Sequence, residues 1–280
     1  MPAMSSAIRL AIAASLLLSV SFAPAAGAAD LGSIAGPSLL LSVPFAPTIG
    51  VADPGSIPGP SRNAGERPFT IDLYGDGDFV TQTDLSQCVG ASMQMMLNMI
   101  GPTNDGTIET QERLFDLARA AWSASVMAAY GAGDREGASP SGWATGLNSL
   151  GVGPYRVTST GSIEAAVRLA AIGIRSTGRP VGLLVWHGAH AWVMSGFEAS
   201  GDPTTDPDAI ITAVVILDPL YPRTTRSHGA APAPGTRVSV ATLGQDYVGW
   251  RRAHVSGLTG RYVLVLPYRS LEPPLGSRPS

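Results

Sequence analysis

The 280-residue sequence contains no lysine and only one cysteine. All 18 basic residues are arginine, which we attribute to the coding bias of a GC-rich bacterial genome and not to mechanism. The single thiol, that of Cys88, has no partner for an intrachain disulfide. Charged residues make up only 14% of the chain, and 21 acidic residues outnumber the bases. The charge therefore gives no reason to expect nucleic acid as a partner.

The sequence also lacks the motifs of metal and phosphate sites. One cysteine and four histidines, without an HExxH motif, do not make a convincing set of zinc ligands. His187 and His190 would need a third ligand that the sequence does not indicate. No glycine-rich phosphate loop follows an expected strand. We therefore expect neither a metal ion nor a cofactor.

The first 28 residues have the pattern of a secretory signal peptide. Arg9 supplies the positive region, residues 10–20 form an apolar run that is short for a bilayer span, and residues 26–28 offer a small-residue cleavage site. No cysteine follows the run, which argues against a lipid anchor. We expect a secreted or cell-surface bacterial protein without a stable membrane span after cleavage; the alternative is an uncleaved anchor. Removing residues 1–28 leaves 17 arginines against 21 acids, a net charge of −4.

A repeat crosses the end of this signal. Residues 16–38 and 39–61 are identical at 17 of 23 positions, and the second copy carries five prolines. We expect residues 29–67 to be an extended, poorly ordered linker. Residues 68–270 have the composition of a globular domain, and about 200 residues are ample for one core. The tail, residues 271–280, is rich in proline, glycine and serine and is expected to be flexible.

Four stretches in the first half of this domain have helical periodicity. The first ends near Ile100, before Gly101-Pro102, and Asp84 or Ser86 can serve as its N-cap. Its apolar residues form a broad face that we expect to be buried. The other three helices are expected at residues 108–122, 140–150 and 163–176, the last two after Ser139 and Ser162.

The second half of the domain has the pattern of strands. Short apolar runs separated by turn residues are expected to form strands at residues 181–186, 191–197, 210–217 and 261–266. Residues 240–250 are expected to form a short helix. Helices first and an antiparallel sheet second indicate an α+β domain. Most of its tryptophans are expected to lie in the core, and one of them can line the cleft.

Cys88 stands at the start of the first helix and is our candidate nucleophile. A helix N-terminus favours a thiolate through its positive dipole end and its unpaired N–H groups. In an exported chain, a single cysteine without a disulfide partner suggests a role other than an intrachain disulfide, such as a reactive thiol. The alternative is a buried cysteine that only fills the core.

A cysteine nucleophile needs a base, and His190 is our candidate. It opens the expected strand 191–197, and rigid strand backbone can aim an imidazole across a cleft. His187, three residues earlier, competes for this role. His228 and His254 lie in polar, loop-like stretches and are weaker candidates.

Asp218 is the candidate to orient His190. It follows the expected strand 210–217 and precedes Pro219. If this strand pairs with strand 191–197, its end lies beside the start of the other, because the two run antiparallel. The carboxylate can then accept the imidazole Nδ1–H and stabilise the imidazolium. The alternative is an Asp-Pro turn that only ends a strand.

Gln82 lies six residues before Cys88 and is the candidate donor for an oxyanion. Its side-chain amide can reach back beside the Cys88 backbone N–H, which would give the oxyanion two donors. Gln87 is nearer in sequence, but it directly precedes the nucleophile.

Together these residues resemble the papain superfamily of cysteine peptidases, and most of all its compact bacterial branch, the bacteriocin-leader-processing (double-glycine) peptidases and their secreted relatives. The resemblance spans residues 80–266 and rests on the order and spacing of the candidates, with 102 residues from Cys88 to His190 and 28 from His190 to Asp218. It implies a papain-like α+β fold. In that fold an N-terminal helical half carries the cysteine, a C-terminal antiparallel sheet carries the histidine, and the cleft lies between them.

The chain departs from the family at the nucleophile. Val89 stands where papain-like enzymes often have tryptophan, and Gln87-Cys88-Val89 replaces the Asp-Cys-Gly of the leader-processing enzymes. No transporter domain is recognised, so the double-glycine leader substrate is not carried over.

These observations predict a secreted thiol hydrolase that cleaves peptide or isopeptide bonds. Cys88 attacks the carbonyl, His190 moves the proton, Asp218 orients His190, and Gln82 helps to hold the oxyanion. The expected partner is a peptide or protein substrate, with cell-wall peptide as one candidate. Two alternatives remain open: a catalytically silent binding module of the same fold, and an acyltransferase that uses the same triad.

Overall fold

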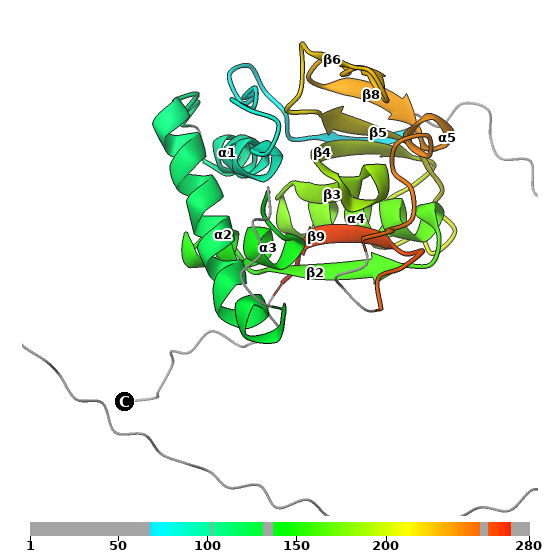
Figure 1. Cartoon of the computed structure of the whole chain (residues 1–280). Coiled ribbons are helices and arrows are strands. Elements are labelled where there is room, and N and C mark those ends of the chain that lie inside the picture. Colours follow the sequence, from blue (N-terminus) through cyan, green and yellow to red (C-terminus); the bar gives the residue numbers. More distant parts are fainter. Residues whose placement is uncertain (1–67, 102, 131–136, 253–256, 270–280) are drawn as a thin grey trace, which may run out of the picture. The chain divides into compact units, whose positions relative to one another are not determined.

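The computed structural model describes residues 68–101, 103–130, 137–252 and 257–269, and only the backbone of residues 122–130 (Figure 1). The expected signal peptide, the repeat, the linker and the tail lie outside the described residues, as does His254. Within the described part, no helix is both long enough and apolar enough to span a bilayer.

Five helices form where the sequence has helical periodicity. Their bounds are α1 Cys88–Ile100, α2 Ile108–Tyr130, α3 Pro140–Ser149, α4 Ile163–Thr177 and α5 Val240–Leu243. Ser139 and Ser162 cap α3 and α4 as expected, since their side chains accept hydrogen bonds from the backbone N–H groups of Gly142 and Ala165. The expected helix 240–250 is shorter, since α5 ends at Leu243 and Gly244 occupies its C-cap position.

The cap expected for α1 is wrong. Gln87 occupies the N-cap position and makes no side-chain capping bond. The Asp84 carboxylate instead accepts hydrogen bonds from the backbone N–H and the hydroxyl of Ser86, at 2.7 and 2.6 Å. Asp84 therefore stabilises the turn before the helix and leaves the first turn of α1 without a side-chain cap.

A seven-stranded antiparallel sheet forms the centre of the domain (Figure 1). Its order is β2-β9-β3-β4-β5-β8, and β1 pairs with β4 beyond the end of β3. The strands are β1 Phe69–Asp72, β2 Tyr155–Thr160, β3 Val181–Val185, β4 His190–Ala199, β5 Ile211–Leu217, β8 Thr236–Ser239 and β9 Tyr262–Pro267. A separate hairpin pairs β6 Thr224–Thr225 with β7 Gly229–Ala230.

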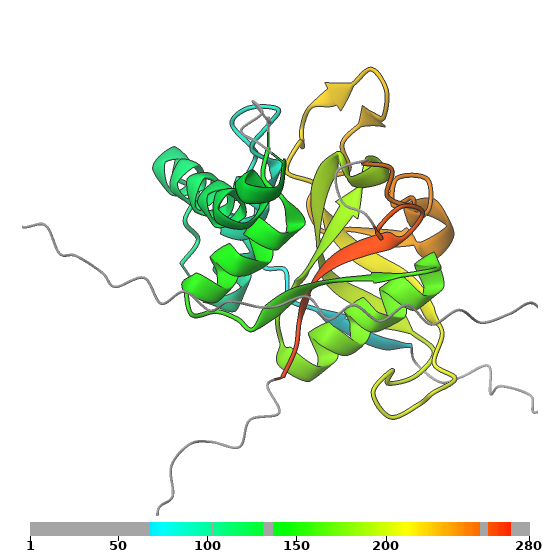
Figure 2. The ribbon, with the colours of Figure 1, turned by 60° about the horizontal axis from the view of Figure 1, so that its bottom comes forward.

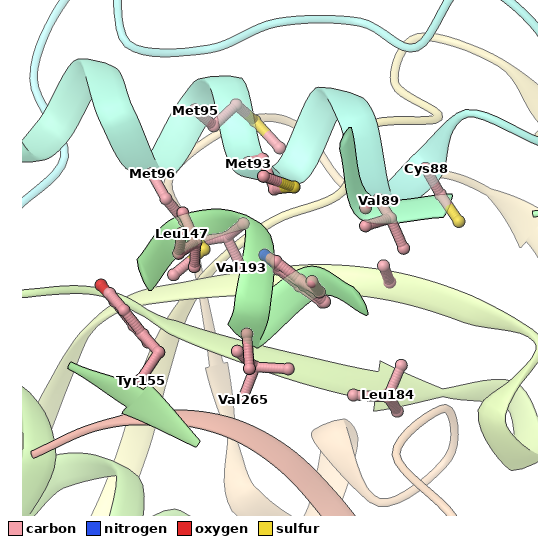
Figure 3. Packing of buried hydrophobic residues seen from close by; sticks show 14 of the residues in the cluster. Cys88, Val89, Met93, Met95, Met96, Leu147, Tyr155, Leu184, Val193 and Val265 are labelled. Carbon is pink, nitrogen blue, oxygen red and sulfur yellow. The ribbon is translucent and has the colours of Figure 1, made fainter. Parts of the chain in front are cut away.

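Two hydrophobic clusters cover the two faces of this sheet. One joins α1, α2 and α3 to the sheet through residues such as Met93, Leu147 and Val193 (Figure 3). The other joins α4 to the opposite face through residues such as Ile174 and Met194. Val193 and Met194 enter different clusters because successive strand side chains point to opposite faces. Figure 2 shows α4 lying along the sheet, away from the helical layer of α1–α3.

The α+β class is confirmed, with the cysteine helix packed against an antiparallel sheet. The strict division into helices first and strands second is wrong, because β1 precedes α1 and β2 lies between α3 and α4. Both strands are short and half-exposed, so they carry little of the apolar pattern that marks a buried strand.

Candidate active site

Cys88 is the first residue of α1. Its side chain extends from the N-terminal end of this helix toward the sheet (Figure 3). Only 8% of its surface is exposed. The backbone N–H groups of the first helical turn have no partners within the helix, and the helix dipole places positive potential at this end. Because no side chain caps these groups, the N-terminus of α1 can stabilise negative charge on a sulfur or an oxygen beside it.

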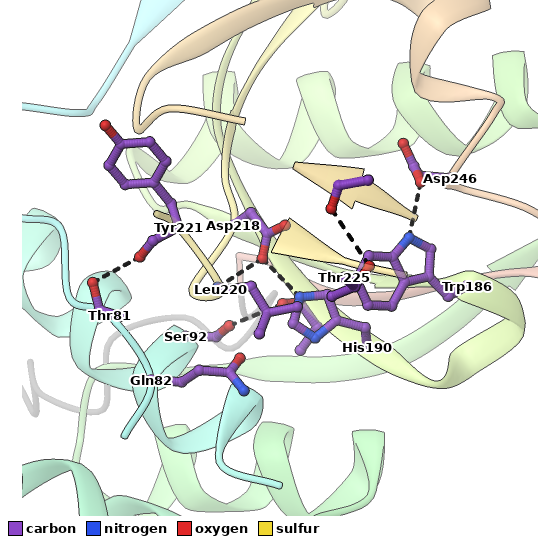
Figure 4. Close-up of polar contacts among 12 residues, drawn as sticks. Thr81, Gln82, Ser92, Trp186, His190, Asp218, Leu220, Tyr221, Thr225 and Asp246 are labelled. Atoms are coloured by element: carbon purple, nitrogen blue, oxygen red, sulfur yellow. Dashed lines mark hydrogen bonds and ion pairs between the residues drawn. The ribbon is translucent and has the colours of Figure 1, made fainter. Parts of the chain in front are cut away.

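His190 opens strand β4 and lies beside Asp218, which follows the last residue of β5. The Nε2 atom of His190 is 2.7 Å from the Oδ1 atom of Asp218 (Figure 4). The expected pairing of these two strands is confirmed: Val193 of β4 faces Leu217 of β5. Antiparallel register therefore brings the start of one strand to the end of the other.

The ring of His190 is oriented differently from the sequence-based expectation. Nε2, and not Nδ1, meets the carboxylate, which leaves Nδ1 for a second partner. The Cys88 thiol is close enough to the ring to act on its charge. Burial alone would lower the pKa of His190, but the hydrogen bond with Asp218 and the nearby Cys88 side chain raise it to about 9. The site therefore favours the imidazolium form of His190.

Asp218 is held by more than His190. Its Oδ1 atom also accepts a hydrogen bond from the backbone N–H of Leu220 at 2.9 Å. The residue is 1% exposed, so its charge is stabilised by fixed donors and not by solvent. The adjoining turn is fixed too, since the backbone N–H of Tyr221 donates to the Asp218 carbonyl.

Gln82 is buried, and its hydrogen bonds connect two segments of the candidate site (Figure 4). Its backbone N–H donates to the carbonyl of Pro219, directly after Asp218. Its side-chain Nε2 donates to the carbonyl of Asp84 at 2.5 Å, which uses one of the two amide hydrogens. The backbone bond ties the chain before Cys88 to the chain after β5.

Gln111 of α2 clamps the same segment from the other side. Its Oε1 atom accepts from the backbone N–H of Thr83 at 2.8 Å, and its Nε2 atom donates to the carbonyl of Thr81 at 3.1 Å. The Thr81 hydroxyl in turn donates to the carbonyl of Tyr221 at 2.8 Å. Residues 81–83 are therefore held between α2 and the turn that carries Asp218.

Trp186 is part of the site, which its apolar sequence context did not indicate. Its indole stacks on the His190 ring with centroids 4.4 Å apart, and its Nε1–H donates to Asp246 at 2.8 Å (Figure 4). Three successive residues, Trp186, His187 and Gly188, have positive φ angles of 53°, 58° and 85°. This left-handed turn ends the expected strand 181–186 one residue early. Gly188 is required in it, because a Cβ atom would lie 2.3 Å from the Trp250 ring.

The competing histidines do not join Cys88. The Nδ1 atom of His187 lies 2.8 Å from the carbonyl of Gly249, so its ring fixes a neighbouring loop. His228, next to the β6–β7 hairpin, stacks on Trp186 with centroids 3.9 Å apart. Among the described residues, no group of three or more histidine, cysteine or acidic side chains is placed to hold a metal ion.

Comparisons with known proteins find a structural likeness but no sequence relative. No protein-family model and no curated protein matches the chain. Six solved chains match by structure, and one of them is UfSP from C. elegans. It is similar with a TM-score of 0.42 and 16% identity, over 74% of this chain and 36% of the UfSP chain. The chain thus covers about a third of UfSP, and the function proposed below rests on the geometry of the site.

Proposed function

We propose that this chain is a papain-like thiol hydrolase that cleaves peptide or isopeptide bonds through Cys88, His190 and Asp218. The observation that carries the proposal is the place of the His190 ring, which the Asp218 carboxylate holds at Nε2 and the Cys88 thiol influences from close by. A pKa of about 9 for His190 keeps the imidazolium charged at neutral pH. This charge and the N-terminus of α1 both place positive potential beside the Cys88 sulfur.

The reaction then proceeds through an acyl-enzyme. The Cys88 thiolate attacks the carbonyl carbon, a C–S bond forms, and the π electrons of the carbonyl move to its oxygen. When the tetrahedral intermediate collapses, the C–N bond breaks and the His190 imidazolium gives its proton to the leaving amine. Neutral His190 next takes a proton from water, whose oxygen attacks the thioester. The C–S bond breaks, and Cys88 leaves as a thiolate beside a renewed imidazolium.

The oxyanion is held by the backbone N–H of Cys88 and the free side-chain hydrogen of Gln82. The first donor belongs to the uncapped start of α1. The second is positioned by the bonds of Gln82 to Pro219 and Asp84. Donors fixed in this way cost no rearrangement when the charge develops.

The substrate is a peptide or protein met outside the cell, with bacterial cell-wall peptide as one candidate. This part of the proposal rests on the signal-like residues 1–28 and on the acidic net charge, which gives nucleic acid no attraction. The relation to the bacteriocin-leader-processing branch also stays a prediction. Gln87 and Val89 count against it, because they depart from the motif of that branch.

A catalytically silent binding module is the second candidate, and the burial of the triad favours it. Cys88 is 8% exposed and His190 is 4% exposed, so a substrate needs the rim of the site to open. Acyl transfer differs from hydrolysis only in the acceptor, an amine in place of water, and uses the same groups.

The test compares the full chain with its Cys88→Ala variant against mixed peptides and cell-wall fragments. We expect the variant to lose turnover completely, while a matched His187→Ala variant keeps it, because His187 binds the Gly249 carbonyl outside the triad. Alkylation by iodoacetamide separates the two candidates. A reactive triad gives fast alkylation near neutral pH, whereas a silent module gives a slow reaction that rises only toward alkaline pH. Equal turnover by the parent and Cys88→Ala would refute the proposal.

A further inference from the structure

The Asp218 carboxylate has one buried oxygen without a partner. Oδ1 accepts hydrogen bonds from His190 and from the Leu220 backbone, whereas Oδ2 has no partner among the described residues. The side chain is 1% exposed. A charged oxygen left without a donor in such a place is costly, so a native structure normally supplies one.

A buried donor without a partner lies across the strands from this oxygen. Trp192 is 3% exposed, and its indole Nε1–H has no acceptor among the described residues. Val193 of β4 faces Leu217 of β5, and Trp192 and Asp218 each lie one residue beyond that pair. Side chains directly opposite in antiparallel strands share a face, with Cβ atoms roughly 5 Å apart. His190, two residues before Trp192, is on the same side of β4.

Both residues line one small pocket. It is lined by Trp192 and Asp218, by the indole of Trp186, and by residues around the β6–β7 hairpin such as Thr225 and His228. Its volume of about 20 Å³ exceeds the ~10–15 Å³ that one water molecule needs. A cation would satisfy the carboxylate but not the indole N–H. Water satisfies both groups, because it accepts from one and donates to the other.

We propose that Trp192 is a positioning residue for Asp218, and that its indole N–H holds Oδ2 through one bridging water molecule in this pocket. The carboxylate is then fixed at both oxygens, by His190 and Leu220 at Oδ1 and by Trp192 through water at Oδ2. This inference deepens the proposed function, on which its consequence for catalysis rests. The contact of Trp192 with Asp218 through water can be tested without a measurement of catalytic activity.

The structural test uses the five indole N–H resonances of the ¹⁵N-labelled full chain, assigned by single Trp→Phe variants. We expect the Trp192 indole proton to show a cross-peak to bound water, and Asp218→Asn to shift this resonance and remove the cross-peak. Trp143 is the matched control, since its indole N–H is also buried without a partner but does not line the pocket. A Trp192 resonance that Asp218→Asn leaves in place overturns the inference, and a shift without a water cross-peak overturns the bridging water.

The kinetic test compares Trp192→Phe with Trp143→Phe. Both variants shorten a buried tryptophan, so both lose packing, but only the first removes the donor for Asp218. We expect Trp192→Phe to slow turnover and Cys88 alkylation by roughly three- to tenfold, the range of a lost neutral hydrogen bond, and Trp143→Phe to change them less than twofold among molecules that remain folded. Equal losses of turnover and alkylation rate in the two variants would show that Trp192 contributes only packing, which would overturn the positioning role. Failure of the proposed function would appear instead as an active Cys88→Ala variant, with the indole result unaffected.

Discussion

The Nε2 atom of His190 lies 2.7 Å from Oδ1 of Asp218, and neither side chain has more than 4% of its surface exposed. This contact follows from the register of two adjacent strands, because β4 begins where β5 ends. It also decides which ring nitrogen is left for Cys88. The proposed nucleophile comes from the helical layer, whereas the proposed base and orienting carboxylate come from two neighbouring strands. The register of the sheet therefore places two of the three proposed groups.

The raised pKa of His190 predicts how stability depends on pH. The ordinary value of 6.5 applies to the unfolded chain and about 9 to the folded chain, so the folded state binds the proton more tightly. This contribution to stability is complete below pH 6.5 and is lost as the pH rises toward 9. We expect the free energy of unfolding to fall across this range by on the order of 1–3 kcal/mol. Chemical denaturation at several pH values measures it.

His190→Ala is the matched variant for this measurement. It removes the titrating group, so the fall between pH 6.5 and 9 should flatten, even though the variant is less stable overall. An unchanged slope in His190→Ala would show that another group causes the pH dependence. In the parent, turnover should also decline above pH 9, as the imidazolium that protonates the leaving amine is lost.

Gln82→Ala is predicted to impair catalysis more than binding. The loss of one oxyanion donor typically lowers kcat by about 10²–10³-fold, and KM should change little because the donor acts on charge in the transition state. Steady-state kinetics on a peptide found to be a substrate measure both constants. Gln87→Ala is the control, since its Oε1 atom accepts from the Thr83 hydroxyl and the residue has no part in the proposed oxyanion site. Similar losses in kcat for both variants would contradict the role of Gln82.

Local signals in the sequence predicted much of this fold. Helix α4 is bounded by a serine cap and by Gly178 in left-handed geometry, so its limits could be read directly. The pairing of β4 with β5 followed from two apolar runs joined by a turn-rich segment. Strands β2 and β8 were missed because nearly all of their residues are partly or fully exposed and their apolar pattern is weak.

The details of the site depended on contacts that no local pattern reveals. Asp84 was expected to cap α1, but its contact with Ser86 competes with that role. The orientation of the His190 ring depends on its stacking with Trp186, which in turn requires the left-handed turn at residues 186–188. A Trp-His-Gly sequence between two strands was the available signal for such a turn, because glycine tolerates positive φ.

Trp186→Leu is predicted to weaken the site without unfolding the domain. The indole stacks on the His190 ring, and a cation–π contact of this kind is worth about 1 kcal/mol, so its loss should lower the pKa of His190 by less than about one unit. The upper inflection in the pH profile of Cys88 alkylation should move toward lower pH by the same amount, with little change in rate at neutral pH. His228→Ala removes the other ring that stacks on Trp186 and should move this inflection less. Alkylation rates measured between pH 5 and 10 give both values. A larger effect of His228→Ala than of Trp186→Leu would contradict this assignment.

Gly90→Ala is predicted to destabilise the domain by displacing the cysteine helix. A Cβ atom at Gly90 would lie 2.8 Å from the carbonyl oxygen of Gln111 and 2.9 Å from Cβ of Phe115, so α1 and α2 would have to separate. Overpacking of this kind costs about 1–3 kcal/mol. The shift would also disturb Gln111, which holds the segment before Cys88, so the alkylation rate should fall together with the unfolding free energy.

Gly161→Ala is the control for this variant, because a Cβ atom there would have no neighbour within 4 Å and the φ angle is not in the left-handed region. Replacing glycine at such a site restricts the unfolded chain and should raise stability slightly, by about 0.4–1 kcal/mol. Thermal or urea unfolding of the two variants beside the parent measures the difference. If Gly90→Ala were as stable as the parent, α1 and α2 would not be in the close contact that positions Cys88 at the site.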